Sequence, residues 1–335
     1  MGVFSGGGIL PTQDRADSAW NRLALSTPQP DPFCATTHWQ LAFREAFDPD
    51  RPFIVRYDSD GLVQFALHSL YGGRPALGPI ERTWLFGCNV IGNSAPNLLE
   101  ELLFELREDE ETRTWPVGVS GLDPKGALAA SLRSRFDQRY SFNVSKAGVQ
   151  CAASLEGGLE GFLSRRSGNL RRNLRRYSTR ASEMGVLFER HVPTTVEDAA
   201  VLFERLIAVE QASWKGIGRC GMDQPRTRRF YWAMLSRLAR SGDARVMVST
   251  HEGRDIGYIF GGVAAGIYRG QQFSFDDRYA ALSLGNLMQF EQISWLCEEG
   301  AQRYDLGPLL GLSMAYKHHW TELKFPIEAW SIQAR

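Results

Sequence analysis

The sequence predicts a mixed α/β protein, an α+β arrangement in which one sheet combines antiparallel and parallel strands. Its 335 residues suffice for about two domains, and the 43% apolar and 23% charged residues are typical of globular proteins. In the second half, two helical patterns precede three strand patterns joined by short turns, and then a helix and a further strand. Short turns join antiparallel neighbours, whereas a helical crossover places its two strands in parallel, so a sheet of mixed direction is expected.

The first 30 residues are rich in glycine and proline, and we expect residues 1–30 to form a flexible arm around one short segment near Trp20. A first domain is predicted over residues 31–150. It begins with a helix at 37–47, in which aromatic residues recur every four positions and make one apolar face. The elements expected after this helix are a hairpin of strands at 52–57 and 62–70, a helix at 96–106, a strand at 115–120 and a helix at 128–140.

Small residues and the pair Gly157-Gly158 mark a boundary, and we expect a second domain over residues 151–335. Its predicted helices lie at 164–184, 196–212, 227–240 and 285–299, with a short helix or turn at 316–320. Its predicted strands lie at 186–191, 244–250, 255–264, 267–276, 303–306 and 324–332.

The overall charge limits the classes of function. Lysine and arginine balance aspartate and glutamate at 38 each, so nucleic-acid binding would have to depend on local charge. No apolar run approaches the roughly 18 residues that a membrane span needs, and the N-terminus lacks the basic residues of a signal peptide. The five cysteines, an odd number without a CxxC pair, fit a reduced protein. We therefore expect a cytoplasmic protein without a transmembrane segment.

The segment 272–287, QFSFDDRYAALSLGNL, predicts an anion-binding turn. A strand leads through a loop of small residues into an amphipathic helix, for which Ser283 is a good N-cap, and Gly285 permits close approach at the first turn. Amides at a helix start bind anions, and the helix dipole favours negative charge there. The turn is therefore a candidate pyrophosphate cradle; the alternative is an ordinary capped helix.

Three segments in this order resemble one family. Residues 274–307, followed by Tyr316-Lys317 and Trp320, combine a strand, a turn with glycine, a helix ending in Glu-Gly and a short strand with Asp305. Residues 210–216 read EQASWKG, and an arginine-rich stretch covers 163–180. The order resembles the CelD-like, FemAB-related branch of the GNAT acyltransferase superfamily, over most of the chain and most strongly over residues 160–325. In one departure, Leu284 stands where the family often has proline, so a preset φ is lost but no N–H donor.

The resemblance implies two tandem GNAT-like domains, of which the N-terminal one is degenerate. The C-terminal domain would bind acyl-CoA, such as acetyl-CoA, with the diphosphate on the main chain of 284–287 and the thioester beside strand 272–275. The acceptor would attack the carbonyl directly, while a base removes its proton and an acid protonates the departing thiolate. No metal is expected. The residues expected to bind the cofactor are Phe275, Ser283, Leu284, Gly285, Asn286 and Leu287.

The same segments supply candidate catalytic residues. Asp276 is a candidate base because repulsion from Asp277 would raise one of the two pKa values, and Glu210 is a competing base. Tyr316 is the candidate acid because a phenol is protonated at neutral pH, and Lys317 accompanies it. The alternative for each is a structural or surface role. The residues expected to bind the substrate are Trp214, Lys215 and Asp305.

The arginine-rich stretch has two interpretations. It is either a solvated helix face or an anion-binding surface for a phosphorylated acceptor, CoA or tRNA. Its arginines are Arg165, Arg166, Arg171, Arg172, Arg175, Arg176 and Arg180.

Three functions follow from the resemblance. The first is acyl-CoA-dependent transfer to an amine or hydroxyl of a small molecule or cell-envelope precursor. The second is Fem-type transfer from aminoacyl-tRNA to a peptide or peptidoglycan precursor. The third is a catalytically inactive GNAT-like binding protein in polysaccharide or envelope biogenesis.

Overall fold

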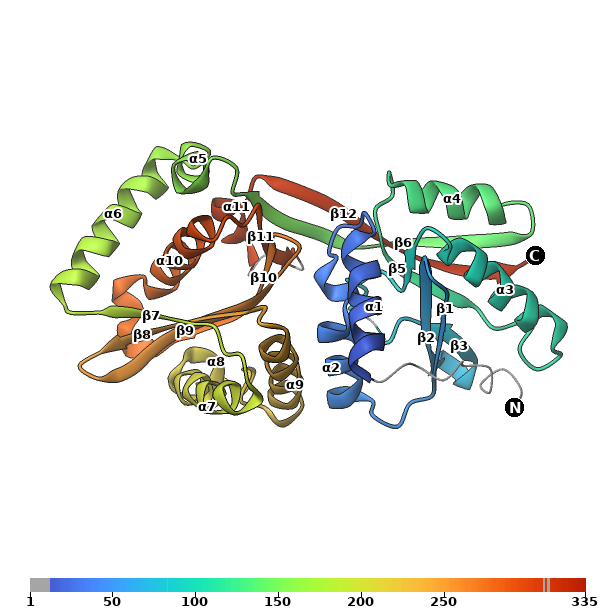
Figure 1. The fold of residues 1–335 in the computed structure, drawn as a ribbon, viewed down its shortest axis with the longest axis horizontal. Coiled ribbons are helices and arrows are strands. Elements are labelled where there is room, and N and C mark those ends of the chain that lie inside the picture. Colours follow the sequence, from blue (N-terminus) through green and yellow to red (C-terminus); the bar gives the residue numbers. More distant parts are fainter. Residues whose placement is uncertain (1–12, 83, 310, 312–313) are drawn as a thin grey trace. The chain divides into compact units, whose positions relative to one another are not determined.

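The computed structural model describes residues 13–82, 84–309, 311 and 314–335 (Figure 1). The chain folds into two compact units, Met1–Gln150 with Phe325–Arg335, and Cys151–Lys324. Residues 325–335, which we expected in the C-terminal domain, therefore belong to the first unit. None of the helices in the described residues has both the length and the apolar character that crossing a bilayer requires.

The first unit is built on strands in the order β1-β2-β3-β5-β12. The predicted hairpin is confirmed, since β1 and β2 pair antiparallel from Phe53↔Ala66 to Tyr57↔Leu62. The unit's strands are β1 Phe53–Tyr57, β2 Gly61–Ser69, β3 Pro75–Gly78, β4 Val90–Gly92, β5 Val117–Leu122 and, for most of their lengths, β6 Tyr140–Ser154 and β12 Leu323–Ala334. Its helices are α1 Gln13–Ser26, α2 Thr37–Phe47, α3 Ala95–Glu108 and α4 Ala127–Phe136, with 3-10 turns at Phe33–Ala35 and Tyr71–Gly73.

Two predictions in the first unit are wrong. The expected arm contains a helix, α1, which is fixed because the Trp20 indole donates to the carbonyl of Ala35 at 2.7 Å and Trp20 is buried. Residues 1–12 of that arm lie outside the described residues. The helix expected at 128–140 ends at Phe136, and a long strand, β6 Tyr140–Ser154, follows it. Most of the first ten residues of β6 are exposed or half-buried, so their sequence lacks the apolar alternation by which a strand is recognised.

The second unit contains a sheet in the order β11-β10-β9-β8-β7. Neighbours from β7 to β10 pair antiparallel, and β10 pairs with β11 in parallel, as the crossover predicts. The strands are β7 Leu187–His191, β8 Ala244–His251, β9 Arg254–Ala264, β10 Ile267–Phe275 and β11 Arg303–Pro308. The helices are α5 Gly158–Ser164, α6 Gly168–Glu183, α7 Val196–Ala212, α8 Trp214–Ile217, α9 Pro225–Ser241, α10 Leu284–Glu298 and α11 Lys317–Trp320.

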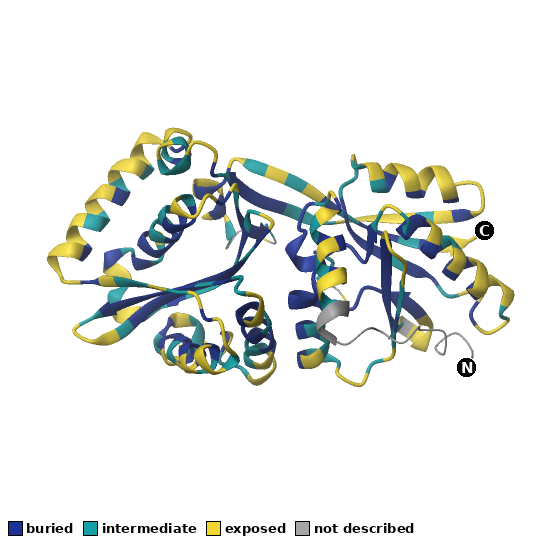
Figure 2. Ribbon diagram, viewed as in Figure 1, coloured by how far each residue is buried: buried dark blue, intermediate teal, exposed yellow. Residues whose placement is uncertain are grey.

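Helices cover both faces of this second sheet. α10 and α6 lie on one face and α7, α8 and α9 on the other (Figure 1). The α10 side chains Leu284, Leu287 and Met288 pack with Met247 and Ile259 of the sheet. The central strands are mostly buried, whereas α6 is largely exposed (Figure 2).

The basic helix expected at 164–184 begins later than predicted. Ser167 ends the preceding turn and caps α6, because its hydroxyl accepts from the amide of Leu170 at 3.2 Å. A serine whose hydroxyl accepts from the amide three residues later is a common N-cap. The sequence prediction missed this helix start because the arginine-rich pattern begins before Ser167. Arg165 and Arg166 therefore precede α6, and both pair with Glu322.

Candidate active site

Strands β10 and β11 form a fork, which is the geometric centre of the candidate site. They pair in register only at Ile267↔Arg303, Tyr268↔Tyr304 and Arg269↔Asp305 in the described part of the chain. β10 continues to Phe275 while remaining paired with β9, and its register with β9 shifts between Gly270 and Gln272. A bulge of this kind bends a strand and increases its twist, which separates β10 from β11. Beyond Arg269, one edge of β10 is thus open to another binding partner.

The start of α10 lies directly after β10. A 3-10 turn, Asp277–Leu282, leads to Ser283, which has a left-handed backbone with φ of 55°. Ser283 occupies the N-cap position, but its hydroxyl does not cap the helix. The nearby Ser283 and Arg176 side chains lower the pKa of the Tyr177 phenol of α6. The prediction of a capping serine is therefore wrong, because the left-handed backbone turns the side chain away from the helix amides.

At the start of α10, some main-chain amides donate hydrogen bonds within the described residues and others do not. Asn286 and Leu287 donate to the carbonyl of Ser283 at 2.9 and 3.2 Å. No hydrogen bond within the described residues uses the amides of Leu284 and Gly285. The side chains of Leu284 and Leu287 are buried in the core and that of Asn286 is exposed. An anion at this turn would therefore be held by main-chain donors.

Gly285 is needed for close packing. A Cβ atom at this position would lie 3.1 Å from Cε1 of Phe275 and 3.2 Å from Cε2 of Phe273, both on β10. The groups that approach this glycine are rings of the protein itself, and the approach of an anion that we expected here stays a prediction.

Phe273 connects most of the candidate residues. The Lys215 ammonium lies 5.6 Å from the centre of its ring, and the Tyr316 ring packs edge-on at 6.0 Å. Lys215, Tyr316, Phe275 and Gly285 are therefore brought together around this ring at the fork. Phe273 itself was predicted only as part of strand 272–275; its position two residues before Phe275 places both rings on one face, which is the signal that could have identified it.

Lys215 is fixed by a buried polar network. Its ammonium donates to the carbonyl oxygen of Phe273 at 2.7 Å and to Oε1 of Gln272 at 3.0 Å, and it lies 3.9 Å from Oε1 of Glu210. Burial lowers the pKa of Lys215, and the Glu210 carboxylate opposes that effect. Gln272 in turn donates to the hydroxyl of Tyr231 at 2.6 Å. The cation is thus held at the open edge of β10.

Glu210 is a structural member of the same network. Its side chain is 0% exposed. One carboxylate oxygen accepts from the amide of Met222 at 2.7 Å and the other from the hydroxyl of Tyr258 at 2.9 Å. Burial raises the pKa of Tyr258 well above its usual range, so its phenol remains a donor. A base with both oxygens already accepting hydrogen bonds in the core has poor access to an acceptor's proton.

Asp276 is also unsuited to act as a base. It is 3% exposed, and Arg278 donates to it from Nε at 3.0 Å to each oxygen and from NH2 at 2.5 Å. These hydrogen bonds lower the pKa of Asp276. Burial, rather than the repulsion by Asp277 that we expected, is what raises this pKa, and the Arg278 guanidinium outweighs it. A carboxylate with a lowered pKa is a weak base at neutral pH.

Tyr316 has the properties of a proton donor. It precedes α11 and is partly exposed, and burial of its hydroxyl raises its pKa, while Arg269 opposes this rise. It therefore stays protonated at neutral pH. Lys317 is buried and donates to the carbonyl of Pro308 at 2.6 Å. Asp305 is buried and pairs with Arg303, with Nε at 2.7 Å.

Trp214 is not a core residue, since 59% of it is exposed on α8. It directly precedes Lys215 in α8. Within the described residues, no three or more histidine, cysteine, aspartate or glutamate side chains are grouped to hold a metal.

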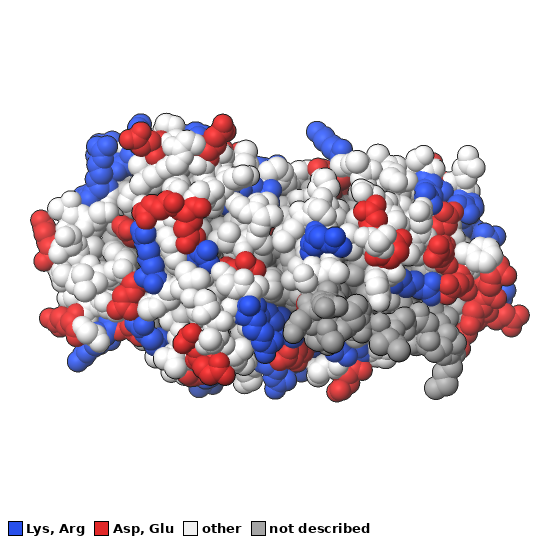
Figure 3. All heavy atoms as spheres, in the orientation of Figure 1, with Lys and Arg blue, Asp and Glu red and all other residues white. Residues whose placement is uncertain are grey.

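The arginines of α6 differ in their contacts, and one of them, Arg176, lies over the ring of Tyr177. Arg180 donates to the carbonyl of Ala281 at 3.3 Å and so ties α6 to the turn before α10. Arg171, Arg172 and Arg175 are exposed and form no ion pair with any described carboxylate. Lysine and arginine atoms gather over the upper part of this helix, whereas both signs are interspersed over the rest of the face in view (Figure 3). α6 therefore carries local positive charge on a neutral chain.

Residues 168–318 match the model of a family described as an acetyltransferase (GNAT) domain. The structure resembles FemX, with 12% identity, 94% of this chain and 95% of FemX covered, and a TM-score of 0.64. It also resembles a conserved protein of unknown function from Bacteroides thetaiotaomicron, with 11% identity and a TM-score of 0.67. The match covers 97% of this chain and 100% of that protein. A third similar structure is L-PGS from Bacillus licheniformis, at 18% identity, 91% and 93% coverage and a TM-score of 0.53. No curated protein sequence matches the chain.

At such identities, the structural likeness shows the fold alone. It extends over both units of this chain, and together with the family match it confirms the predicted mixed α/β fold and the resemblance to FemAB-like GNAT proteins. The degeneracy of the N-terminal domain stays a prediction.

Proposed function

Because residues 168–318 belong to the GNAT acetyltransferase domain family, we propose that the chain transfers an acyl group, acetyl in the first instance, from acyl-CoA to an amine or hydroxyl acceptor. The observation that carries the proposal is the pair of unused amides, Leu284 and Gly285, at the helix start that follows the open strand β10. The acceptor we propose is a small molecule or a cell-envelope precursor.

The donor would be held by main-chain groups at one end and by the fork at the other. The diphosphate fits the α10 amides, where the helix dipole adds a favourable potential. The acyl end fits the edge of β10 beyond Arg269, where main-chain groups have no partner in β11. When bound, acyl-CoA supplies an activated carbonyl with a thiolate leaving group.

Residues at the fork have distinct proposed roles. Tyr316 donates a proton to the departing thiolate, because its pKa is raised and its ring packs against Phe273. Lys215 places positive charge at the open strand edge, where negative charge develops on the carbonyl oxygen during attack. Neither Asp276 nor Glu210 is assigned the base, since Arg278 and the Tyr258–Met222 pair occupy their oxygens. The proton that the attacking amine or hydroxyl loses passes to solvent water.

A second donor is favoured by one specific observation. Arg171, Arg172 and Arg175 form an exposed cationic face on α6, and α6 contacts the turn before α10 through Arg180. Such a face suits a nucleic-acid backbone, so aminoacyl-tRNA is the alternative donor.

A donor panel tests the two proposals. Thermal unfolding of the full chain is measured with acetyl-CoA, longer acyl-CoAs, free CoA and tRNA, and thiol release is followed with candidate amines. A ligand at a hundred times its Kd should stabilise the fold by about 2.7 kcal/mol. Stabilisation by acyl-CoA with thiol release supports the first proposal. Stabilisation by tRNA alone, weakening steeply with salt, overturns it in favour of the second. If no donor stabilises the fold, both transfer proposals are overturned and the chain is a catalytically inactive binding protein.

A further inference from the structure

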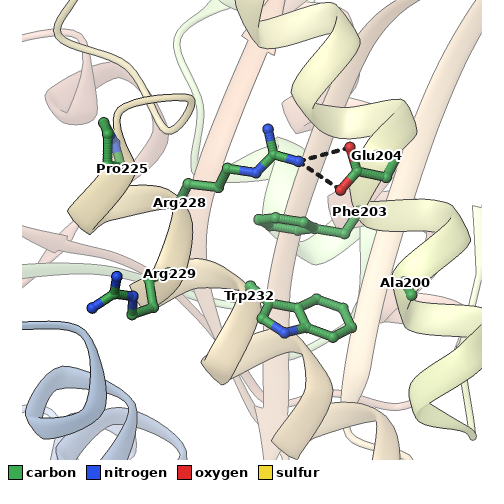
Figure 4. A pocket seen from close by; sticks show the side chains of 7 residues that line it. All are labelled: Ala200, Phe203, Glu204, Pro225, Arg228, Arg229 and Trp232. Atoms are coloured by element: carbon green, nitrogen blue, oxygen red, sulfur yellow. Dashed lines mark hydrogen bonds and ion pairs between the residues drawn. The ribbon is translucent and has the colours of Figure 1, made fainter. Parts of the chain in front are cut away.

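A groove between α7 and α9 lies apart from the fork. It has a cavity volume of about 340 Å³ and is open to solvent (Figure 4). Its lining residues are Ala200, Phe203 and Glu204 of α7 and Pro225, Arg228, Arg229 and Trp232 of α9. They recur three and four positions apart on each helix, so each helix presents one face to the groove. A volume near 300 Å³ is at the lower end for small-molecule sites and suits one or two rings.

Two aromatic side chains form the apolar part of the groove. Phe203 is 2% exposed, and Trp232 is half-buried. Their ring centres are 5.6 Å apart and the planes are inclined by 50°, so the rings do not stack on each other. The indole of Trp232 therefore retains a partly exposed surface against which a planar group can pack.

The polar part of the groove has an excess of positive charge. Arg228 donates to both oxygens of Glu204, at 2.7 and 2.8 Å, which neutralises that pair (Figure 4). Arg229 is exposed, and no carboxylate of the described residues pairs with it. The indole nitrogen of Trp232 also donates to no acceptor in the described ranges, so two lining residues, Arg229 and Trp232, retain donors without a protein acceptor.

The position of these arginines is not explained by helix stability. Arg226, Arg228 and Arg229 lie in the first five residues of α9, and its first turn contains no acidic residue. Each cation at a helix N-terminus opposes the helix dipole, which costs stability. An anionic ligand would reverse that cost, because it pairs with the guanidinium and with the positive end of the dipole.

We infer that the groove between α7 and α9 binds a small anion that carries a planar apolar group, such as an aromatic carboxylate. The ring packs against Trp232 over the floor formed by Phe203, and the carboxylate pairs with Arg229 in the two-bond geometry that guanidinium groups favour. The inference concerns residues other than those of the fork and does not depend on the acyl-transfer proposal.

Ligand-observed NMR on the full chain tests the inference with 2-naphthoate and its neutral counterpart 2-naphthamide. We expect saturable binding of the carboxylate and at least about tenfold weaker binding of the amide, since the rings are identical and only the charge differs. Arg229→Gln should reduce carboxylate affinity to that of the amide, and Trp232→Leu should weaken both ligands.

Arg240→Gln is the matched control, because Arg240 is exposed on the last turn of the same helix. It should bind naphthoate as the wild type does. Arg229→Gln removes a cation from a helix N-terminus, so it should not unfold the protein. Equal binding of carboxylate and amide, unchanged binding by Arg229→Gln, or no saturable binding of either ligand would each overturn the inference.

Discussion

The ammonium nitrogen of Lys215 lies 2.7 Å from the carbonyl oxygen of Phe273, on the part of β10 that has no register partner in β11. A main-chain carbonyl in a partly buried position needs a donor, and a side chain from α8 supplies it here. Burying an ammonium group costs desolvation free energy, and burying an apolar side chain does not. The stability of the fold therefore does not explain why a lysine occupies this position. The contact is better explained by a role in shaping the fork.

Lys215→Met should loosen the edge of β10. The Phe273 carbonyl loses a charge-assisted hydrogen bond, and we expect faster amide exchange over residues 270–275. If the fork holds the donor, kcat/KM should also fall by about tenfold or more. Hydrogen-exchange mass spectrometry and thiol release measure the two effects separately.

Lys125→Met, at an exposed position, serves as the control and should change neither quantity. Unchanged exchange in Lys215→Met would show that the lysine does not hold the strand, whatever the activity proves to be.

Tyr316→Phe should remove the proton donor while keeping the edge-on contact with Phe273. We expect the rate of transfer to fall by about a hundredfold, with the free energy of unfolding changed by less than about 0.5 kcal/mol. The pKa of Tyr316 is raised above its usual value of 10. Tyr316 therefore stays protonated below pH 10, and the wild-type rate should not fall through loss of this proton in that range. Rates measured from pH 6 to pH 10 check both expectations; Tyr57→Phe, at another exposed tyrosine, controls for the substitution.

Two substitutions at Gly285 separate charge from packing. Gly285→Ala adds a Cβ atom that displaces the Phe273 and Phe275 rings by a few tenths of an ångström, and donor affinity should drop only slightly. Gly285→Glu adds the same atom and a negative charge at the helix start. It should abolish donor binding, while the carboxylate stabilises the helix by about 0.3–1 kcal/mol. Calorimetric titration with the donor measures both, and equal affinities for the two variants would place the anion elsewhere.

Asp276→Asn tests whether the ion pair between Asp276 and Arg278 stabilises the fold rather than taking part in catalysis. The pair lowers the pKa of Asp276 in the folded state, so it stabilises the fold at pH values above the unfolded-state pKa, near 3.8. That stabilisation is lost as the pH falls through the lowered folded-state pKa. The wild type should therefore be more stable than the variant by a constant amount from about pH 5 to pH 8, and the difference should shrink below pH 3.8.

The rate of transfer should be nearly unchanged in Asp276→Asn. Denaturant unfolding at a series of pH values and a rate measurement at pH 7 provide the data. A hundredfold loss of rate without a loss of stability would instead identify Asp276 as the base.

Local sequence patterns predicted most of the elements and the place of the candidate site. The helix at 37–47, the hairpin after it and the strands β8–β10 follow from apolar periodicity and turn residues, which act over a few positions. The same reasoning placed Gly285 in the first turn of the helix that follows β10, and its contact with an anion stays a prediction. It failed at β6, whose exposed residues carry no alternation, and at α1, whose buried Trp20 is held by a residue from a later turn.

By itself, the sequence determined that this chain has a mixed α/β fold with a glycine-containing turn between a strand and a helix, because periodicity and turn chemistry depend on near neighbours. The tertiary structure alone decided that both carboxylate oxygens of Glu210 accept hydrogen bonds inside the core, and that Lys215 donates to the carbonyl of Phe273, 58 positions away in the chain. Residues 325–335 likewise joined the first unit by pairing β12 with β5. These outcomes depend on which side chains and strand edges meet after packing, and hydrogen-bond partners far apart in the chain leave no local pattern from which to predict them.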